Sequence, residues 1–114
     1  MPSDFKRSPR LRDPDIFRIL HAEGGACGIC GKSYGLELHH VLSRQAERGD
    51  DMRANLVFLC GDHHRRVTAN DEATLIALGW YIRNHRWDVI DYVEGKLGSE
   101  QAADWFLRRL HLSI

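Results

Sequence analysis

Residues 55–64 read NLVFLCGDHH and carry the strongest structural signal in the chain. Residues 56–59 are continuously apolar, which predicts a short buried strand. Gly61-Asp62 follows and allows a helix to begin, with Asp62 as its N-cap. Upstream, residues 36–41 read LELHHV and alternate like a half-buried strand. The sequence therefore predicts two short strands followed directly by a helix.

Three cysteines and a histidine surround these elements in two pairs. Cys27 and Cys30 are two residues apart, as are Cys60 and His63. This gap lets neighbouring ligands on a turn bind one tetrahedral ion, so the four residues form a complete ligand set for a structural zinc. The alternative is buried free cysteines with a surface histidine. Because all three cysteines fall in the two pairs, zinc is favoured, and it would contribute much of the folding free energy of so small a core.

A second set of residues consists of His39, His40, Asn55 and His64. Adjacent strand residues point to opposite faces, so His39 and His40 converge on one site only if the strand bends or ends there. A His-His pair alone is more often a surface feature or a satisfied core pair. Here His64 lies directly after the proposed ligand His63, and this position favours a functional site.

The whole chain has the composition of one soluble globular domain. Its 114 residues carry 16 Lys+Arg and 16 Asp+Glu, and this balance argues against a strongly basic protein that coats nucleic acid. No apolar run has the length of a membrane span, and the N-terminus lacks the apolar region of a signal peptide. Three cysteines cannot all pair within the chain, which favours a reducing cytoplasm.

Helices are expected on both sides of the two strands. Residues 1–12 read as a flexible basic arm, and the sequence leaves open whether it follows DNA or only improves solubility. Asp13-Pro14 then begins a helix that Gly24-Gly25 ends. After the Cys/His segment, three helices are predicted: a short one capped by Asn70 or Thr68 and ended by Gly79, one at about 87–97 with Gly98 after it, and one capped by Ser99.

The Cys and His motifs together resemble the HNH nucleases in their zinc-stapled ββα-metal form, also called the His-Me finger. The resemblance covers roughly residues 26–69 and departs from the family where His63 replaces a commoner cysteine. It implies an α+β fold with residues 13–114 as a single nuclease domain. The ββα-metal core would occupy about 26–69, preceded by one helix and followed by two to three helices at about 70–112.

The resemblance also implies a role for each residue of the second set. His40 would be the general base, because a histidine titrates near neutral pH. His39 and His64 would bind a catalytic divalent ion, with Mg²⁺, Mn²⁺, Ni²⁺ and Zn²⁺ all open. Asn55 would either complete the coordination or hold the loop that orients His40. Three cations flank the motif and are expected to contact phosphate, although a solvated charged face is the default for each: Arg44, Arg65 and Arg66.

The function that follows is a metal-dependent DNA endonuclease that hydrolyses phosphodiester bonds. One active site would nick one strand and leave 5′-phosphate and 3′-hydroxyl ends. A homodimer through the C-terminal helices is expected from the aromatic residues Trp87, Trp105 and Phe106. Two alternatives stay open: a zinc-stabilised nucleic-acid- or protein-binding module without catalysis, and a nuclease selective for branched DNA in recombination or repair.

Overall fold

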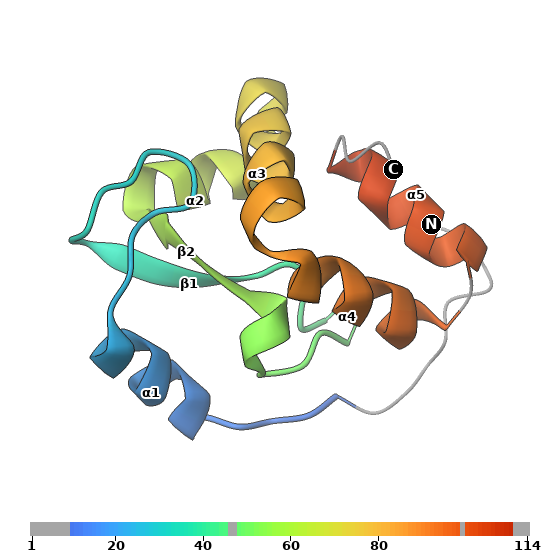
Figure 1. Ribbon diagram of the computed structural model, residues 1–114, viewed down its shortest axis with the longest axis horizontal. Helices are drawn as coiled ribbons and strands as arrows, with labels where there is room; N and C mark the ends of the chain where they lie inside the picture. Colours follow the sequence, from blue (N-terminus) through green and yellow to red (C-terminus); the bar gives the residue numbers. More distant parts are fainter. Residues whose placement is uncertain (1–9, 46–47, 99, 111–114) are drawn as a thin grey trace.

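The computed structural model describes residues 10–45, 48–98 and 100–110 (Figure 1). The α+β class is confirmed, because a two-stranded antiparallel sheet lies among helices. The elements in chain order are α1 (Asp15–Glu23), β1 (Leu36–His40), the 3-10 turn η1 (Arg53–Asn55), β2 (Leu56–Cys60), α2 (Gly61–Thr68), α3 (Glu72–His85), α4 (Trp87–Leu97) and α5 (Glu100–Arg109).

The two strands pair along their whole length. Leu36 lies opposite Cys60 and His40 lies opposite Leu56. β2 is almost completely buried, as its continuous apolar run predicts, whereas the alternating β1 is only partly buried. The two faces of the sheet are covered differently: α1 contacts the face that carries His40, and α2 packs on the face that carries His39 (Figure 1).

The hydrophobic core lies between the sheet and the C-terminal helices. α4 packs against both α3 and α5, and its four buried residues recur at helical spacing. These are Val89, Ile90, Val93 and Leu97, each at most 1% exposed. Gly98 ends α4 in the left-handed conformation, with φ 73°, which a glycine adopts without strain. The apolar side of α5 closes the core through Ala103, Phe106, Leu107 and Leu110.

Two of the predicted helix boundaries are wrong. α3 is capped by Asp71, which accepts a hydrogen bond from the Thr74 N–H at 3.1 Å, and not by Asn70 or Thr68. α3 also continues through Gly79 to His85. A glycine inside a helix costs about 1 kcal/mol. Burying Ile82 beyond it contributes about 2 kcal/mol, so the helix continues.

Two further caps differ from the sequence expectation. α2 has Cys60 as its N-cap residue and no side-chain cap, while Asp62 forms ion pairs inside the first turns of the helix. α1 begins two residues after Asp13, whose carbonyl accepts a hydrogen bond from the Ile16 N–H at 3.2 Å. Ser99, the cap expected for α5, lies outside the described residues.

The end of the predicted basic arm is held against the loop that precedes η1. Arg10 donates a hydrogen bond to the carbonyl of Gly49 at 2.9 Å. The Leu11 carbonyl accepts one from the Asp51 N–H at 2.9 Å. Arg10 and Leu11 are therefore part of the folded structure and not of a flexible arm; residues 1–9 lie outside the described part of the chain.

The aromatic residues predicted to form a dimer surface on the C-terminal helices are not all exposed. Trp87 is 53% exposed, but Phe106 is only 2% exposed and belongs to the core, so it offers no surface to a partner. The Trp105 side chain lies outside what the structure describes. Within the described residues, no helix combines the length and apolar character that a membrane crossing requires.

Candidate metal centre and catalytic cleft

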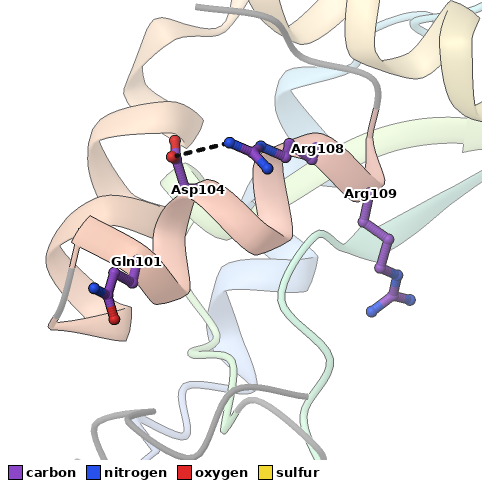
Figure 2. Close-up of a pocket in the computed structure, with 4 residues that line it drawn as sticks. All are labelled: Gln101, Asp104, Arg108 and Arg109. Atoms are coloured by element: carbon purple, nitrogen blue, oxygen red, sulfur yellow. Dashed lines mark ion pairs between the residues drawn. The ribbon is translucent and has the colours of Figure 1, made fainter.

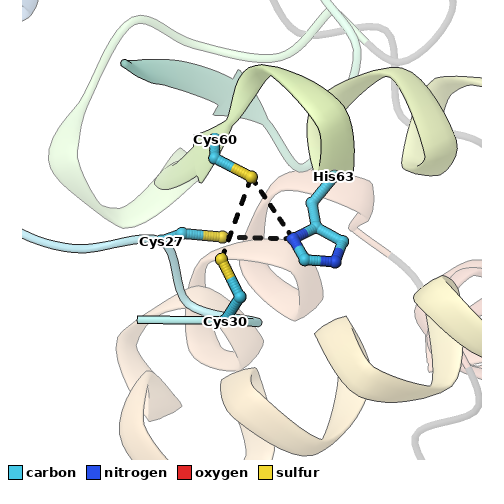
Figure 3. Close-up of side chains that lie close together, drawn as sticks. All are labelled: Cys27, Cys30, Cys60 and His63. Atoms are coloured by element: carbon cyan, nitrogen blue, oxygen red, sulfur yellow. Dashed lines mark hydrogen bonds between the residues drawn. The ribbon is translucent and has the colours of Figure 1, made fainter. Parts of the chain in front are cut away.

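Cys27, Cys30, Cys60 and His63 converge on one point (Figure 3). Their ligand atoms all lie within 4.8 Å of one another. His63 Nδ1 lies 3.3 Å from the Cys60 sulfur and 3.7 Å from the Cys27 sulfur. A zinc tetrahedron with these ligands has edges of about 3.5–3.8 Å. The four residues can therefore hold a zinc ion without a large rearrangement.

Local backbone structure brings the two pairs together. Cys27 and Cys30 lie on a turn in which the Gly31 N–H donates to the Cys27 carbonyl at 2.8 Å. The Gly28 N–H on this turn donates to the Phe58 carbonyl of β2 at 3.0 Å. Cys60 is the last residue of β2 and His63 lies in the first turn of α2. A hydrogen bond to β2 thus places the first ligand pair beside the second.

The charges of the cluster also suit a cation. Burial alone would raise the pKa of Cys27. Hydrogen bonds from the backbone of Cys60 and Cys30 and from the His63 side chain outweigh burial and lower that pKa to about 6. The Lys32 N–H would lower the pKa of Cys30, but burial and the two neighbouring thiols together raise it. Three thiolates this close repel one another, so a bound cation is what allows all three to lose their protons.

His39 and His64 lie side by side across the α2 face of the sheet. Their ring centroids are 5.2 Å apart, with an interplanar angle of 73°. His64 Nδ1 lies 2.6 Å from a carboxylate oxygen of Glu37. The carboxylate accepts the Nδ1 proton and so leaves the Nε2 lone pair for a metal, which is the usual arrangement of a ligating histidine. Burial, together with His64 and His40, lowers the pKa of His39 to about 4 and keeps this imidazole neutral.

His40 lies on the opposite face of the strand and contacts a buried carboxylate. Its Nε2 is 2.9 Å from Oδ1 of Asp51. The same carboxylate accepts hydrogen bonds from Arg10 and from the Asp13 N–H. Burial alone would raise the pKa of Asp51, but the hydrogen bonds from His40 and the Asp13 N–H, with the charge of Arg10, lower it. Asp51 is therefore ionised at neutral pH and accepts the Nε2 proton of His40.

The pKa of His40 itself is lowered. Burial is the largest cause; Arg44 and Arg10 act in the same direction, and the contact with Asp51 partly opposes them. His40 is thus a neutral imidazole at pH 7, with Nε2 protonated towards Asp51 and Nδ1 carrying the lone pair. A neutral imidazole held in one tautomer is a competent general base.

Asn55 is completely buried and holds the loop between the strands. Its Oδ1 accepts from the Leu42 N–H at 2.8 Å. Its Nδ2 donates to the carbonyls of Leu42 at 3.1 Å and of Asp50 at 3.0 Å. Both polar groups of the amide therefore bind backbone. Of the two roles open to Asn55, this geometry matches the one that fixes the loop.

Asp50 connects the same loop to the C-terminal helices. Its carboxylate lies 3.0 Å from the ammonium group of Lys96 and accepts a hydrogen bond from the Tyr92 hydroxyl at 2.7 Å. Burial alone would raise the pKa of Asp50, but the Leu11 N–H, Tyr92 and Lys96 together lower it. α4 and the N-terminal segment are therefore joined at this loop, next to Asp51.

His39, His40 and His64 all line one cleft, which has a volume of about 510 Å³. The residues lining it include Phe17, His39, His40, Arg44, His64 and Arg109. β1 ends at His40, so both histidines of the pair border the cleft although they point to opposite faces. Arg65 and Arg66 do not line the cleft. They extend from α2, and Arg66 lies 3.2 Å from Asp62.

Three residues that contact the histidines or their partners have no recognisable signal in the sequence. Asp51 lies eleven residues after His40 in a polar loop, and Arg10 lies 41 residues before Asp51. Glu37 lies two residues before His39 on the strand, and its contact is with His64 on α2. Only the alternation of β1, which places Glu37 and His39 on the same face, points towards this contact.

Comparison with known proteins agrees with the resemblance. Residues 27–70 match the family model described as HNH endonuclease. This segment contains the four Cys/His ligands, the three other histidines of the motif and Asn55. A search of curated proteins and a search of solved structures each return no match. The match over this segment supports nuclease activity in general, and HNH nucleases use metal ions and act on DNA.

Proposed function

We propose that this protein is a metal-dependent DNA endonuclease that nicks one strand at each active site. One observation carries the proposal: His40, oriented by Asp51, borders the same cleft as the adjacent pair His39 and His64. The match of residues 27–70 to the HNH model supports it. A module that only binds zinc requires none of these three histidines, so their common cleft favours catalysis over binding alone.

The general base in this proposal is His40. Asp51 holds the Nε2 proton, so Nδ1 takes the proton from the attacking water. Because the carboxylate stays ionised, it stabilises the imidazolium that forms when the proton is transferred. The water then attacks phosphorus, the bond to the 3′ oxygen of the preceding sugar breaks, and the products carry 5′-phosphate and 3′-hydroxyl ends.

The catalytic divalent ion is assigned to His39 and His64. Both imidazoles are side by side, and Glu37 fixes the tautomer of His64 with Nε2 available. Such an ion supplies positive charge to the phosphate oxygens and to the leaving group. With only two protein ligands, the site leaves coordination positions for water and substrate, and Mg²⁺, Mn²⁺, Ni²⁺ and Zn²⁺ all stay candidates.

Two further groups support the site without touching the substrate. Asn55 fixes the loop that carries Asp51 through Leu42 and Asp50, and so acts as a positioning residue. The ion held by the four Cys/His ligands is assigned as a structural zinc, since all four positions of its tetrahedron are filled by protein. Because Cys60 ends β2 and His63 lies in the first turn of α2, this zinc would fix the angle at which His64 meets the sheet.

A plasmid assay tests the proposal. Supercoiled plasmid is incubated with the zinc-loaded protein and added Mg²⁺, Mn²⁺ or Ni²⁺, and with no added ion. We expect nicked circles that DNA ligase reseals directly, since ligase requires 5′-phosphate and 3′-hydroxyl ends. His40→Ala is expected to lower the rate at least about 100-fold. His85→Ala is the matched control, because His85 lies on α3 and does not line the cleft.

The outcomes separate the classes of function. Wild-type protein that cleaves no supercoiled, linear, single-stranded or branched DNA with any of these ions contradicts the nuclease proposal. Equal nicking by wild type and His40→Ala shows that His40 is not the base. Cleavage of branched DNA alone supports the same chemistry with a structural preference for its substrate.

A further inference from the structure

One wall of the catalytic cleft comes from outside the segment that matches the HNH model. Phe106, Arg109 and Leu110 of the C-terminal end line the cleft together with His39, His40 and His64. The matched segment ends at residue 70, so this wall belongs to the C-terminal extension of the chain. Its residues can therefore add substrate contacts that the family motif does not contain.

Arg109 is the charged residue of this wall. Its guanidinium carbon lies 5.6 Å from the ring centroid of Phe106, which is itself buried in the core. The neighbouring Arg108 is oriented differently: its guanidinium lies 3.7 Å from Asp104, one turn earlier on α5. Figure 2 shows Arg108 turned towards Asp104 and Arg109 turned away from both. Arg109 lines both the catalytic cleft and the hollow whose lining residues are drawn in Figure 2.

The charges lining the cleft suit an anionic ligand. Two arginines border it: Arg44, just after β1, and Arg109 on α5. Among the described residues that line the cleft there is no Asp or Glu. The charged side chains among these described lining residues are thus the two arginines, beside histidines that are expected to hold a cation. A nucleic-acid backbone is the anion that matches both features.

We propose that Arg109 is a phosphate-binding residue of the cleft, which contacts the DNA backbone from the α5 side. This inference rests on the proposed nuclease function. The planar guanidinium donates paired hydrogen bonds to phosphate oxygens, and the Phe106 ring below it restricts its position. Arg109 takes no part in proton transfer, so it raises affinity for the substrate and leaves the chemical step unchanged.

The test compares two adjacent arginines that lose the same charge. Arg109→Gln and Arg108→Gln are prepared with wild type, and each is checked for zinc content and circular dichroism. Binding of a short DNA duplex is measured without added divalent ion at several salt concentrations. We expect Arg109→Gln to weaken binding about tenfold and to lower the slope of log K against log salt by about one. Arg108→Gln should leave the slope unchanged, and Arg109→Lys should retain it.

Kinetics provide the second measurement. Arg109→Gln is expected to raise KM about tenfold for nicking with kcat within about twofold of wild type. The inference is overturned if Arg109→Gln binds DNA with the wild-type slope, if both glutamine variants lose affinity equally, or if kcat falls while KM does not change. Active wild-type enzyme with an unaffected Arg109→Gln variant refutes only this inference. A wild type that binds DNA through Arg109 and never cleaves it refutes only the nuclease proposal.

Discussion

Asp51 is the residue on which several parts of the molecule depend. Its carboxylate contacts His40, Arg10 and the Asp13 N–H, and its side chain is only 6% exposed. A buried carboxylate with this many donors keeps its charge and its position. The orientation of His40 is therefore determined by the N-terminal segment as well as by its own strand.

Replacing this carboxylate by an amide should affect turnover and not substrate binding. Asp51→Asn can still contact His40 but no longer fixes its tautomer or stabilises its protonated form, so we expect kcat for nicking to fall about 10- to 100-fold with KM within about twofold. Asp62→Asn is the control, because that exposed carboxylate pairs with Arg66 and does not line the cleft. A wild-type kcat for Asp51→Asn would show that His40 needs no orienting partner.

Gly49 should tolerate no side chain. A Cβ at this position would lie 1.8 Å from the Leu42 carbonyl oxygen and 2.8 Å from Nδ2 of Asn55. Because one obstacle is backbone and the other is a buried amide, the loop would have to move. We expect Gly49→Ala to lower the free energy of unfolding by about 2–4 kcal/mol and to reduce nicking, as measured by urea unfolding and the plasmid assay.

Gly31→Ala is the comparison for this substitution. A Cβ at Gly31 meets no atom within 4 Å, although its φ of 78° is unfavourable for alanine. Its cost should be about 1 kcal/mol and come from the backbone alone. Equal stabilities for the two variants would contradict the close approach of Gly49 to Leu42.

The sequence identifies the histidines of the proposed site better than the residues that support them. His39, His40 and His64 are recognisable because their types and spacing are chemically unusual. Asp51 and Glu37 are ordinary polar residues, and their partners lie 11 and 27 residues away in sequence. Such contacts depend on how a loop or a helix packs on the sheet, which no local pattern encodes.

Elements follow the sequence most closely where local and tertiary preferences agree. α4 spans Trp87–Leu97 as predicted, because its buried residues recur at helical spacing and a glycine follows its last turn. α3 differs from its predicted bounds because neither its glycine nor its possible N-cap residues determine where the helix begins and ends. Gly79 interrupts the pattern but not the packing of Ile82, and Asp71 caps the helix although Asn70 and Thr68 are equally good cap types.

Alanine at two glycines, one in the last turn of α4 and one at its C-cap, should change the free energy of unfolding in opposite directions. Gly98 has φ 73°, so Gly98→Ala places a side chain in a left-handed conformation and should cost about 1 kcal/mol. Gly95 is exposed within the helix, and a Cβ there meets nothing within 4 Å. Gly95→Ala should therefore stabilise the protein by about 0.5–1 kcal/mol. Urea unfolding of both variants checks this, and a stabilising Gly98→Ala would contradict the assigned C-cap.

At the scale of the whole molecule, zinc should be required for the folded state. Structural zinc in small domains contributes about 10 kcal/mol or more, which is comparable with the entire stability of a domain of this size. We expect one zinc per chain by elemental analysis. Removing it with a strong chelator should abolish the near-ultraviolet circular dichroism, and returning zinc should restore it.

His63→Ala tests the ligand set separately. Loss of one ligand should lower zinc affinity at least about 100-fold and make unfolding begin near room temperature. His21→Ala is the control, since His21 contacts only the Phe58 ring at 5.4 Å among the ring pairs that the structure describes. A His63→Ala protein with full zinc content and wild-type stability would contradict the assignment of His63 as a ligand.

Association through the C-terminal helices stays a prediction. Trp87 is half exposed at the start of α4, and Phe106 is no longer a candidate because it is buried. A dimer would supply two active sites, one for each strand of a double-strand cut. Sedimentation equilibrium should then show self-association that Trp87→Ser weakens at least about tenfold. A strict monomer for wild type at the concentrations of the plasmid assay would rule this surface out.

The pairing of β1 with β2 has one last consequence. His39 and His40 are neighbours, yet the strand directs one towards α2 and the other towards α1, with His40 opposite Leu56. A slip of one residue in this pairing would exchange the two side chains, and the ring proposed to hold a cation would face the carboxylate proposed to orient the general base. In the proposed mechanism, hydrogen-bond alignment in a five-residue strand thus gives two chemically identical side chains different roles.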